Sequence, residues 1–288
     1  MTDKMKELAV RAISGAVLVA VIVGTLYASP TAFAAVAFVI LVCGMKEFYS
    51  LAEAQGTQPM KILGMTIGIM MFVFAFAAFS TSIESSTAAV ALRYVIVALP
   101  AALVCELTRK SKTPAADIGV TILGTVYVAL PMSLILFLPS LATGEEWNPT
   151  VILFIILTVF ANDIFAYLVG MTANALTGGR THKMFERISP KKTWEGFAGG
   201  IAGALVMGWI AASVLPVGTA VWLGLSVVVA VAAVAGDLVE SMFKRAAGVK
   251  DSGHAIPGHG GFLDRFDALL LAVDFAVIYL ILTGQATM

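Results

Sequence analysis

Residues 236–267 read GDLVESMFKRAAGVKDSGHAIPGHGGFLDRFD and separate two strongly apolar segments of the chain. This stretch contains five acidic side chains, four basic side chains, two histidines and a glycine-rich centre. Charged groups beside or inside a membrane are costly and are therefore a mark of function. We interpret the stretch as the polar link between two membrane helices and as the centre of a site that handles phosphates with metal ions.

Carboxylates occur at both ends of this stretch. The residues expected on one face of the first helix are Asp237, Glu240 or Ser241, and Lys244. Those expected on one face of the second helix are Asp264, Asp267 and Asp274. The link is long enough to return the chain, so Asp237 and Asp264 can meet at the membrane boundary. Hard oxygen ligands of this kind suit Mg²⁺ bound together with substrate phosphates.

The link itself is suited to binding oxygen anions. Its glycines let the backbone approach a ligand closely, with N–H groups facing the anion. The basic side chains that could hold phosphate oxygens are Lys191, Lys192, Lys244, Arg245, Lys250 and Arg265. A zinc site is a weaker alternative, because the only imidazoles are His182, His254 and His259 and no cysteine is near. A structural salt bridge between Asp237 and Lys244 is the other alternative.

A second polar segment, SPKKTWEG at 189–196, precedes another apolar run. We expect Ser189 and Pro190 to form a turn and Lys191 and Lys192 to bind phosphate. The next residues predict a helix start, with Thr193 as the cap and Glu195 and Gly196 in the first turn. Together these features indicate an anion site at a helix N-terminus. The following glycines, at 199, 200 and 203, predict close packing against a neighbouring helix.

A carboxylate is also expected inside the membrane. Asn162 and Asp163 lie near the middle of the apolar run 151–172, and Tyr167 follows Asp163 on the same helix face. An ionisable residue in this position is a functional candidate by default. A polar contact between helices is the structural alternative.

The composition predicts an all-α polytopic membrane protein. Of the 288 residues 59% are hydrophobic and 12% are charged, whereas an average soluble domain is about 25% charged. Strand alternation typical of an outer-membrane barrel is absent. The formal net charge is zero, so no overall field attracts nucleic acid, and we expect no nucleic-acid partner. Cys43 and Cys105 lie in apolar runs and indicate neither a disulfide framework nor a metal site.

We expect about nine membrane-spanning helices. Their ranges are about 10–28, 31–52, 61–80, 88–107, 117–139, 151–172, 195–215, 218–243 and 263–284. The first resembles a signal peptide, but its length and the span that follows it favour an uncleaved helix. Pro100 and Pro131 are expected to kink their helices.

The basic residues predict the orientation. With the N-terminus in the cytoplasm, every Lys and Arg except Arg93 lies in an inside segment. The outer connections near 81–87 and 140–150 contain Glu84, Glu145 and Glu146 and no basic residue. The functional residues are then expected at the cytoplasmic membrane boundary. Glu47, Glu53 and Glu106 fall at cytoplasmic helix ends, where we expect solvated charges.

We divide the chain into an N-terminal region of five spans, 1–150, and a C-terminal catalytic region of four spans, 151–288. The catalytic region has cytoplasmic loops at 173–194 and 244–262. A compact chain of nine spans without a long polar N-terminal extension fits a bacterial plasma membrane.

The stretch from Ser241 to Asp267 resembles the signature of the CDP-diacylglycerol synthases, also called phosphatidate cytidylyltransferases. The matching run is SMFKR at 241–245, KDSG at 250–253 and IPGHGGFLDRFD at 256–267. The NDxxAY stretch at 162–167, SPKKTWEG, and GDLxESMFKR at 236–245 resemble the same family. The resemblance covers about 160–267, and the earlier spans fit in hydropathy and number.

The resemblance implies that CTP and phosphatidic acid react to give CDP-diacylglycerol and pyrophosphate, with the lipid phosphate attacking the α-phosphate of CTP. It implies dependence on Mg²⁺, a second monovalent ion such as K⁺, and a homodimer. It makes Asp237 and Asp264 metal ligands, supported by Asp267. The residues that it places at the phosphates or in catalysis are Lys244, Arg245, Lys250, Asp251, His259 and Arg265. Those that complete the pocket are Asn162, Asp163, Tyr167, Ser189, Pro190, Lys191, Lys192, Thr193, Glu195, Gly196, Ser241, Gly260 and Gly261.

One departure from the family pattern is visible after the helix that contains Tyr167. Met171 stands where a basic residue is common, and Arg180 or Lys183 could supply the charge. Two alternatives stay open. One is a transferase that acts on another lipid phosphate, such as a polyprenyl phosphate. The other is an ion-coupled transporter, which would need polar residues in both halves of the membrane.

Overall fold

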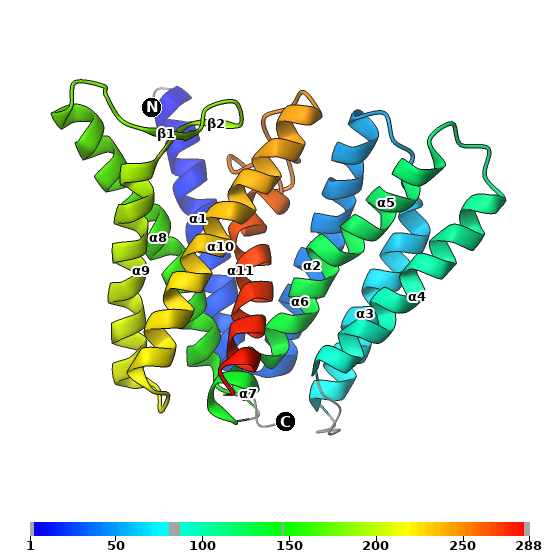
Figure 1. The fold of residues 1–288 in the computed structure, drawn as a ribbon, viewed down its shortest axis with the longest axis horizontal. Coiled ribbons are helices and arrows are strands. Elements are labelled where there is room, and N and C mark those ends of the chain that lie inside the picture. The colour runs from blue at the N-terminus through cyan, green and yellow to red at the C-terminus, as the bar shows by residue number, and fades with distance from the viewer. Residues whose placement is uncertain (1–2, 81–86, 146, 285–288) are drawn as a thin grey trace. The chain divides into compact units, whose positions relative to one another are not determined.

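The computed structural model describes residues 3–80, 87–145 and 147–284. Its long helices are α1 (Asp3–Ala28), α2 (Pro30–Ala54), α3 (Lys61–Ser80), α4 (Thr87–Leu107), α8 (Pro149–Leu176), α9 (Trp194–Val214), α10 (Thr219–Ala246) and α11 (Leu263–Leu282) (Figure 1). Shorter helical segments are α5 (Pro114–Gly124), a π-helical turn (Thr125–Ala129), α6 (Leu130–Leu134), a 3₁₀ turn (Ile135–Phe137) and α7 (Leu138–Thr143). Two short strands, β1 (Lys183–Phe185) and β2 (Ser189–Thr193), complete the chain.

All nine expected spans fall on helical segments. Within the described residues, seven helical stretches are long and apolar enough to cross a membrane: α1, α2, α3, the continuous run from α5 to α7, α8, α9 and α10. The chain is therefore an integral membrane protein. Helices α4 and α11 are not among the seven, and their crossing stays a prediction. The expected outer loop with Glu84, and also Glu146 and the side chain of Arg93, lie outside the described residues.

The chain divides into two compact units that do not follow its order. Unit 1 comprises Met1–Leu136 and Phe243–Phe266, and unit 2 comprises Phe137–Met242 and Asp267–Met288. Unit 1 thus joins the N-terminal helices to residues 243–266 of the polar stretch. The functional division near residue 150 is a separate prediction, which these units do not address.

Unit 1 is built on one face of α2. Its buried residues Phe33, Ala37, Leu41, Met45 and Phe48 recur at helical spacing. The ring of Phe48 packs edge-on against that of Phe243, with centroids 5.5 Å apart, and both rings contact Tyr127. The rings attach the start of the polar link to α2.

The helix that contains Pro131 is interrupted, as expected. Proline has no N–H to donate to the preceding turn, and the residues just before it form the π-helical turn.

Glu47, Glu53 and Glu106 were expected to be solvated, and two of them are not. Glu106 is buried and paired with Arg109, at 2.9 Å, and Glu47 is held by backbone N–H groups described below. Glu53 is exposed as expected and pairs with Lys61.

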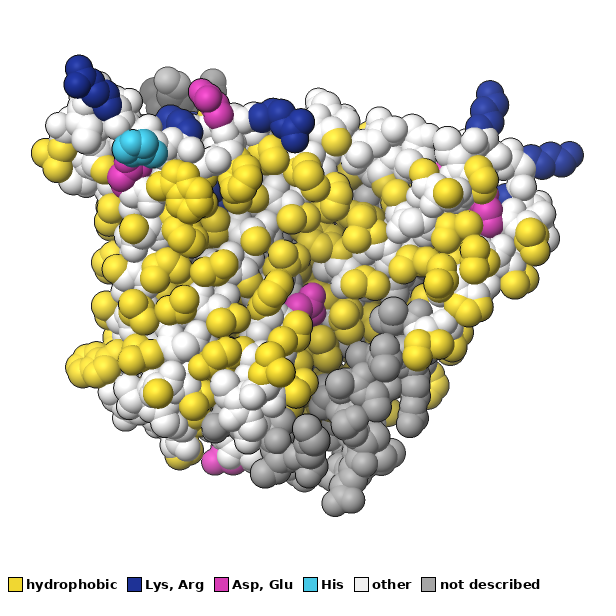
Figure 2. Space-filling model, in the orientation of Figure 1, with side chains coloured by type: hydrophobic (Ala, Val, Ile, Leu, Met, Phe, Trp, Pro, Cys, Tyr) yellow, Lys and Arg dark blue, Asp and Glu magenta, His cyan; other side chains and the backbone are white. Residues whose placement is uncertain are grey.

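Unit 2 contains an antiparallel pair of helices, α8 and α9, packed through glycines (Figure 1). A β-carbon at Gly199 would lie 2.5 Å from Val169, and one at Gly200 would lie 2.4 Å from Asn162. The prediction of close packing at these glycines is confirmed. At one end of this pair Figure 2 shows basic side chains gathered together, whereas hydrophobic side chains cover most of the visible face along the helices.

The connection between α8 and α9 holds a small hairpin that the sequence reasoning missed. β1 and β2 pair antiparallel, with Phe185 opposite Ser189. The turn expected at Ser189 and Pro190 is therefore wrong: these residues are in a strand, and the turn lies at 186–188. The expected cap is confirmed, since the Thr193 hydroxyl accepts a hydrogen bond from Gly196 N at 3.1 Å.

Candidate active site

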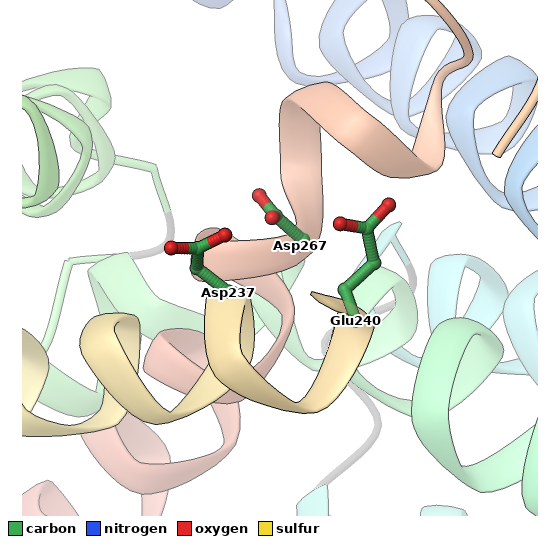
Figure 3. A group of neighbouring side chains, drawn as sticks. All are labelled: Asp237, Glu240 and Asp267. Carbon is green, nitrogen blue, oxygen red and sulfur yellow. The ribbon is translucent and has the colours of Figure 1, made fainter. Parts of the chain in front are cut away.

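Three acidic side chains converge in unit 2. Asp237 and Glu240 lie one turn apart on α10, and Asp267 lies in α11 (Figure 3). One oxygen from each lies within 4.8 Å of the others. Glu240 is fully buried and Asp267 is 9% exposed. We call Asp237, Glu240 and Asp267 the acidic trio.

The trio depends on a close approach of two helices. Gly236 lies directly against the backbone of α11, where a β-carbon would be 2.4 Å from the carbonyl oxygen of Asp267 and 3.2 Å from Cα of Ala268. Because glycine has no side chain, α10 can bring Asp237 and Glu240 to the start of α11. The glycine quoted at the head of the signature thus has a packing role beside the carboxylates.

The donor set of the trio fits a hard divalent cation. Two carboxylates at this separation repel by about 3–4 kcal/mol at an effective dielectric constant of about 20. One positive group offsets part of this repulsion, because Lys192 Nζ lies 2.5 Å from Asp237 Oδ2. Carboxylate oxygens are the ligands that Mg²⁺ prefers. Within the described residues, no other group of His, Cys, Asp and Glu side chains gathers closely enough to hold a metal.

The trio agrees in part with the expected ligands. It unites Asp237 and Asp267, and it adds Glu240, which sequence reasoning placed on the same helix face without assigning it to the site. Asp237 pairs with Lys192, and Lys244 pairs with Asp264. The alternative of a structural salt bridge between Asp237 and Lys244 stays open.

A cavity of about 460 Å³ in unit 2 gathers many of the expected substrate-binding residues. Those that line it are Asp163, Tyr167, Pro190, Lys191, Lys192, Thr193 and Gly196. Lys183 and Met171 line it too, whereas Arg180 is not among its lining residues. That Lys183 supplies the basic charge missing at 171 stays a prediction. Asn162 is fully buried behind the cavity and donates to Asp163 at 3.3 Å.

Two residues predicted for the pocket turn to other partners. The Glu195 carboxylate accepts hydrogen bonds from the backbone N–H of His182 at 3.0 Å and contacts its Nδ1 at 2.8 Å. This contact joins the first turn of α9 to the segment before β1. Ser189 pairs with β1 and is not among the cavity residues.

In unit 1, Asp264 organises the polar link. Its Oδ1 lies 2.7 Å from Lys244 Nζ. Its Oδ2 accepts from Ser252 N at 2.8 Å, from Ser252 Oγ at 2.9 Å and from Gly261 N at 2.8 Å. Gly260 adopts a positive φ of 81° beside it, a conformation that favours glycine. Asp264 therefore holds both ends of the link, and its expected role as a metal ligand stays a prediction.

A second cavity, of about 440 Å³, lies in unit 1 and is lined by the polar link. Its ionisable residues are Arg11, Lys250, Asp251, His254, His259 and Arg265. Arg265 Nε donates to the carbonyl of His259 at 2.9 Å, and the His259 ring contacts Ser14 Oγ of α1 at 2.7 Å. Sequence reasoning missed Arg11 and Ser14, because a basic residue at the start of a first span is already explained by topology.

Two further predicted residues face neighbours rather than a cavity. The Ser241 hydroxyl donates to Asp237 Oδ1 at 3.5 Å, and Arg245 donates to the carbonyl of Val249 at 3.4 Å. The predicted roles of these side chains at the substrate stay predictions.

Comparison with known proteins assigns the chain to a family. The model of the cytidylyltransferase family matches residues 9–283. The chain belongs to this family.

Several curated relatives of this cytidylyltransferase are phosphatidate cytidylyltransferases. The one from Synechocystis sp. is 31% identical over 277 residues, which are 87% of this chain and 88% of the relative. The one from Mycobacterium bovis is 37% identical over 169 residues, 58% of this chain and 52% of the relative. That from Bacillus subtilis is 36% identical over 168 residues, 58% of this chain and 59% of the relative. The family match extends from α1 to α11 and so includes the trio and the residues of both cavities.

Proposed function

We propose that this cytidylyltransferase transfers the CMP moiety of CTP to phosphatidate, giving CDP-diacylglycerol and pyrophosphate for phospholipid biosynthesis. A phosphate oxygen of the lipid attacks the α-phosphorus of CTP. The bond between that phosphorus and the oxygen bridging to the β-phosphate breaks, and pyrophosphate leaves. Such a transfer needs positioning and charge stabilisation more than covalent help from the protein.

The acidic trio is the observation that carries this proposal. In a member of a nucleotidyltransferase family, three converging carboxylates beside a lysine-lined cavity suit a reaction between two phosphates. Asp237, Glu240 and Asp267 would hold Mg²⁺, which when bound neutralises phosphate charge and stabilises an in-line displacement. Lys192 limits the repulsion within the trio before substrate arrives.

Each cavity has basic side chains of its own that would bind phosphate oxygens. In unit 2 these are Lys183 and Lys191, and in unit 1 they are Arg11, Lys250 and Arg265. A lysine ammonium is a point charge suited to phosphate, and a guanidinium can donate two parallel hydrogen bonds. Asp264 and Lys244 keep the polar link in the conformation that presents Lys250 and His259.

The proposal extends to orientation and assembly. The distribution of Lys and Arg supports a cytoplasmic N-terminus and a site at the cytoplasmic boundary. The bacterial relatives support a bacterial plasma membrane. A monovalent ion such as K⁺ in the site, Asp264 as an additional metal ligand, and a homodimer rest on the family resemblance.

The test uses the purified chain in mixed micelles with phosphatidic acid, Mg²⁺ and CTP labelled with ³²P at the α-phosphate. We expect label in the lipid phase, no label after EDTA, and none with Asp237→Asn. Glu53→Gln is the matched control, because Glu53 is an exposed carboxylate on another helix. Label with only a different lipid phosphate would change the substrate. Folded protein that labels no lipid phosphate would overturn the proposed chemistry.

A further inference from the structure

The side chain of Glu47, in α2, caps the N-terminus of α11, the helix that follows the polar link. Its Oε1 accepts a hydrogen bond from Phe262 N at 3.0 Å, and its Oε2 accepts from Leu263 N at 2.8 Å. Phe262 immediately precedes α11 and Leu263 is its first residue, and N–H groups at the start of a helix have no intrahelical acceptor. The capping carboxylate thus comes from α2, 216 residues away from Leu263 in the chain.

Glu47 and Asp264 both contact the side chain of Ser252. The Ser252 hydroxyl lies 3.0 Å from Glu47 Oε2 and 2.9 Å from Asp264 Oδ2, so it connects the two carboxylates. Asp264 in turn binds Ser252 N and Gly261 N. The two ends of the polar link are therefore fastened to each other and to α2 through one network.

The backbone of the link is fitted closely around the Glu47 carboxylate. A β-carbon at Gly253 would lie 2.6 Å from Glu47 Oε1, and one at Gly261 would lie 2.3 Å from Oε2. Neither glycine has a positive φ. The reason for glycine here is space for the carboxylate, since any larger residue would push it away from its donors.

The residues that this network holds in place are those that the proposed transfer uses. The link carries Lys250 and His259 into the cavity of unit 1, and the first turn of α11 carries Asp264 and Arg265. Asp267, of the acidic trio, follows in the same helix. Glu47 lines neither of the two cavities described above, so its effect on substrate must be indirect.

We propose that Glu47 is a positioning residue for cytidylyl transfer, which sets where α11 begins and how the polar link is held. This inference rests on the proposed function. It assigns a role in the reaction to a residue of the N-terminal helices, outside the region 151–288 in which the sequence placed catalysis. Outer-shell partners of this kind typically change metal affinity or activity by about 10–100-fold when they are removed.

Glu47→Gln is the sharpest test, because it keeps the shape and removes acceptor capacity. The two carboxylate oxygens accept from different N–H groups, so the amide of glutamine must direct its NH₂ at one of them. One donor of the first turn then faces another donor. Glu53→Gln removes the same charge from the same helix at an exposed ion pair with Lys61 and is the matched control.

Three measurements on Glu47→Gln separate positioning from a general loss of fold. We expect kcat to fall about tenfold or more while KM for CTP changes less than about threefold. The Mg²⁺ concentration for half-maximal rate should rise by about tenfold. In the metal-free protein, amide hydrogen exchange of residues 250–266 should become faster, with no change in α3. Glu53→Gln should match the wild type in all three.

Each outcome decides the point. If the wild-type chain transfers no label to phosphatidate, the proposed function fails before Glu47 is considered. If the wild type is active and Glu47→Gln equals it in kcat, Mg²⁺ dependence and exchange, the positioning role is overturned alone. If Glu47→Gln does not fold, Ser252→Ala takes its place, because it removes only the hydroxyl that joins Glu47 to Asp264. We expect a smaller loss of kcat in the same direction, and unchanged kcat would overturn the proposal.

Discussion

Two groups of carboxylates in this chain are arranged in opposite ways. In the acidic trio of unit 2, Asp237, Glu240 and Asp267 face one another. In the network of unit 1, Glu47 and Asp264 face N–H and O–H donors and the ammonium of Lys244. In the first arrangement like charges lie close together, which Lys192 and the N–H of Ala268 offset in part and a bound cation would offset further. In the second, both carboxylates lie against donors. Carboxylates that repel one another are typical of a site kept for function at the expense of stability.

The largest effect is expected in the trio. Glu240→Gln removes one of three like charges and one metal ligand, so transfer should fall by about a hundredfold or more. Because repulsion is relieved, the melting temperature in detergent with EDTA should be equal to or above that of the wild type. The rise in melting temperature on adding Mg²⁺ should shrink. A lower melting temperature without metal would mean that Glu240 stabilises the fold. The acidic trio and the network of unit 1 would then not differ in their effect on stability.

In the network of unit 1, by contrast, we expect the loss of a carboxylate to lower the melting temperature of the metal-free protein. Asp264→Asn takes away the carboxylate that is 2.7 Å from Lys244 and leaves an amide among three donors. Breaking a buried ion pair on one side typically costs about 3–5 kcal/mol. The metal-free protein should therefore melt at a lower temperature and should transfer label more slowly. An unchanged melting temperature, measured beside Glu240→Gln, would show that the donors around Asp264 contribute little.

A smaller effect should come from the helix contact that builds the trio. Gly236→Ala places a methyl group 2.4 Å from the Asp267 carbonyl, so α10 and α11 must separate slightly. A displacement of about 1 Å can cost up to about a hundredfold in rate, and we expect about tenfold here because helices can slide. Gly218→Ala, where a β-carbon meets nothing within 4 Å, is the control. Equal rates in the two variants would mean that the trio tolerates a wider spacing.

The sequence predicted the helices well because each is a long apolar run with its own boundary signals. Thr193 is an example, since its cap depends only on residues three positions away. The hairpin of β1 and β2 was missed because polar residues in a short loop carry no hydrophobic alternation. Asp237 and Asp264 were assigned as metal ligands from residue type and position, and Asp267 was added through the family resemblance.

The partners of each carboxylate could not be predicted from the sequence. Glu47 and Glu53 have the same residue type, helix and expected side of the membrane, yet one caps α11 and the other is exposed. The difference arises from elements 200 residues later in the chain, which no local pattern reports. For the same reason Arg11 and Ser14 were not predicted to lie beside the polar link, because their contacts with it are also long-range.

The contact between Glu47 and the polar link also affects the order in which the chain folds during synthesis. Glu47 and Ser252 are separated by 205 residues, which a ribosome takes roughly 10–40 s to add at about 5–20 residues per second. Helix α2 therefore enters the membrane long before residues 252–263 are synthesised. Until then the Glu47 carboxylate is in contact with water or lipid headgroups. Unit 1 closes only when synthesis is nearly finished. A chain that stops before residue 252 would keep α2 intact and would leave the Glu47 carboxylate without these donors, a defect that quality-control proteases could recognise.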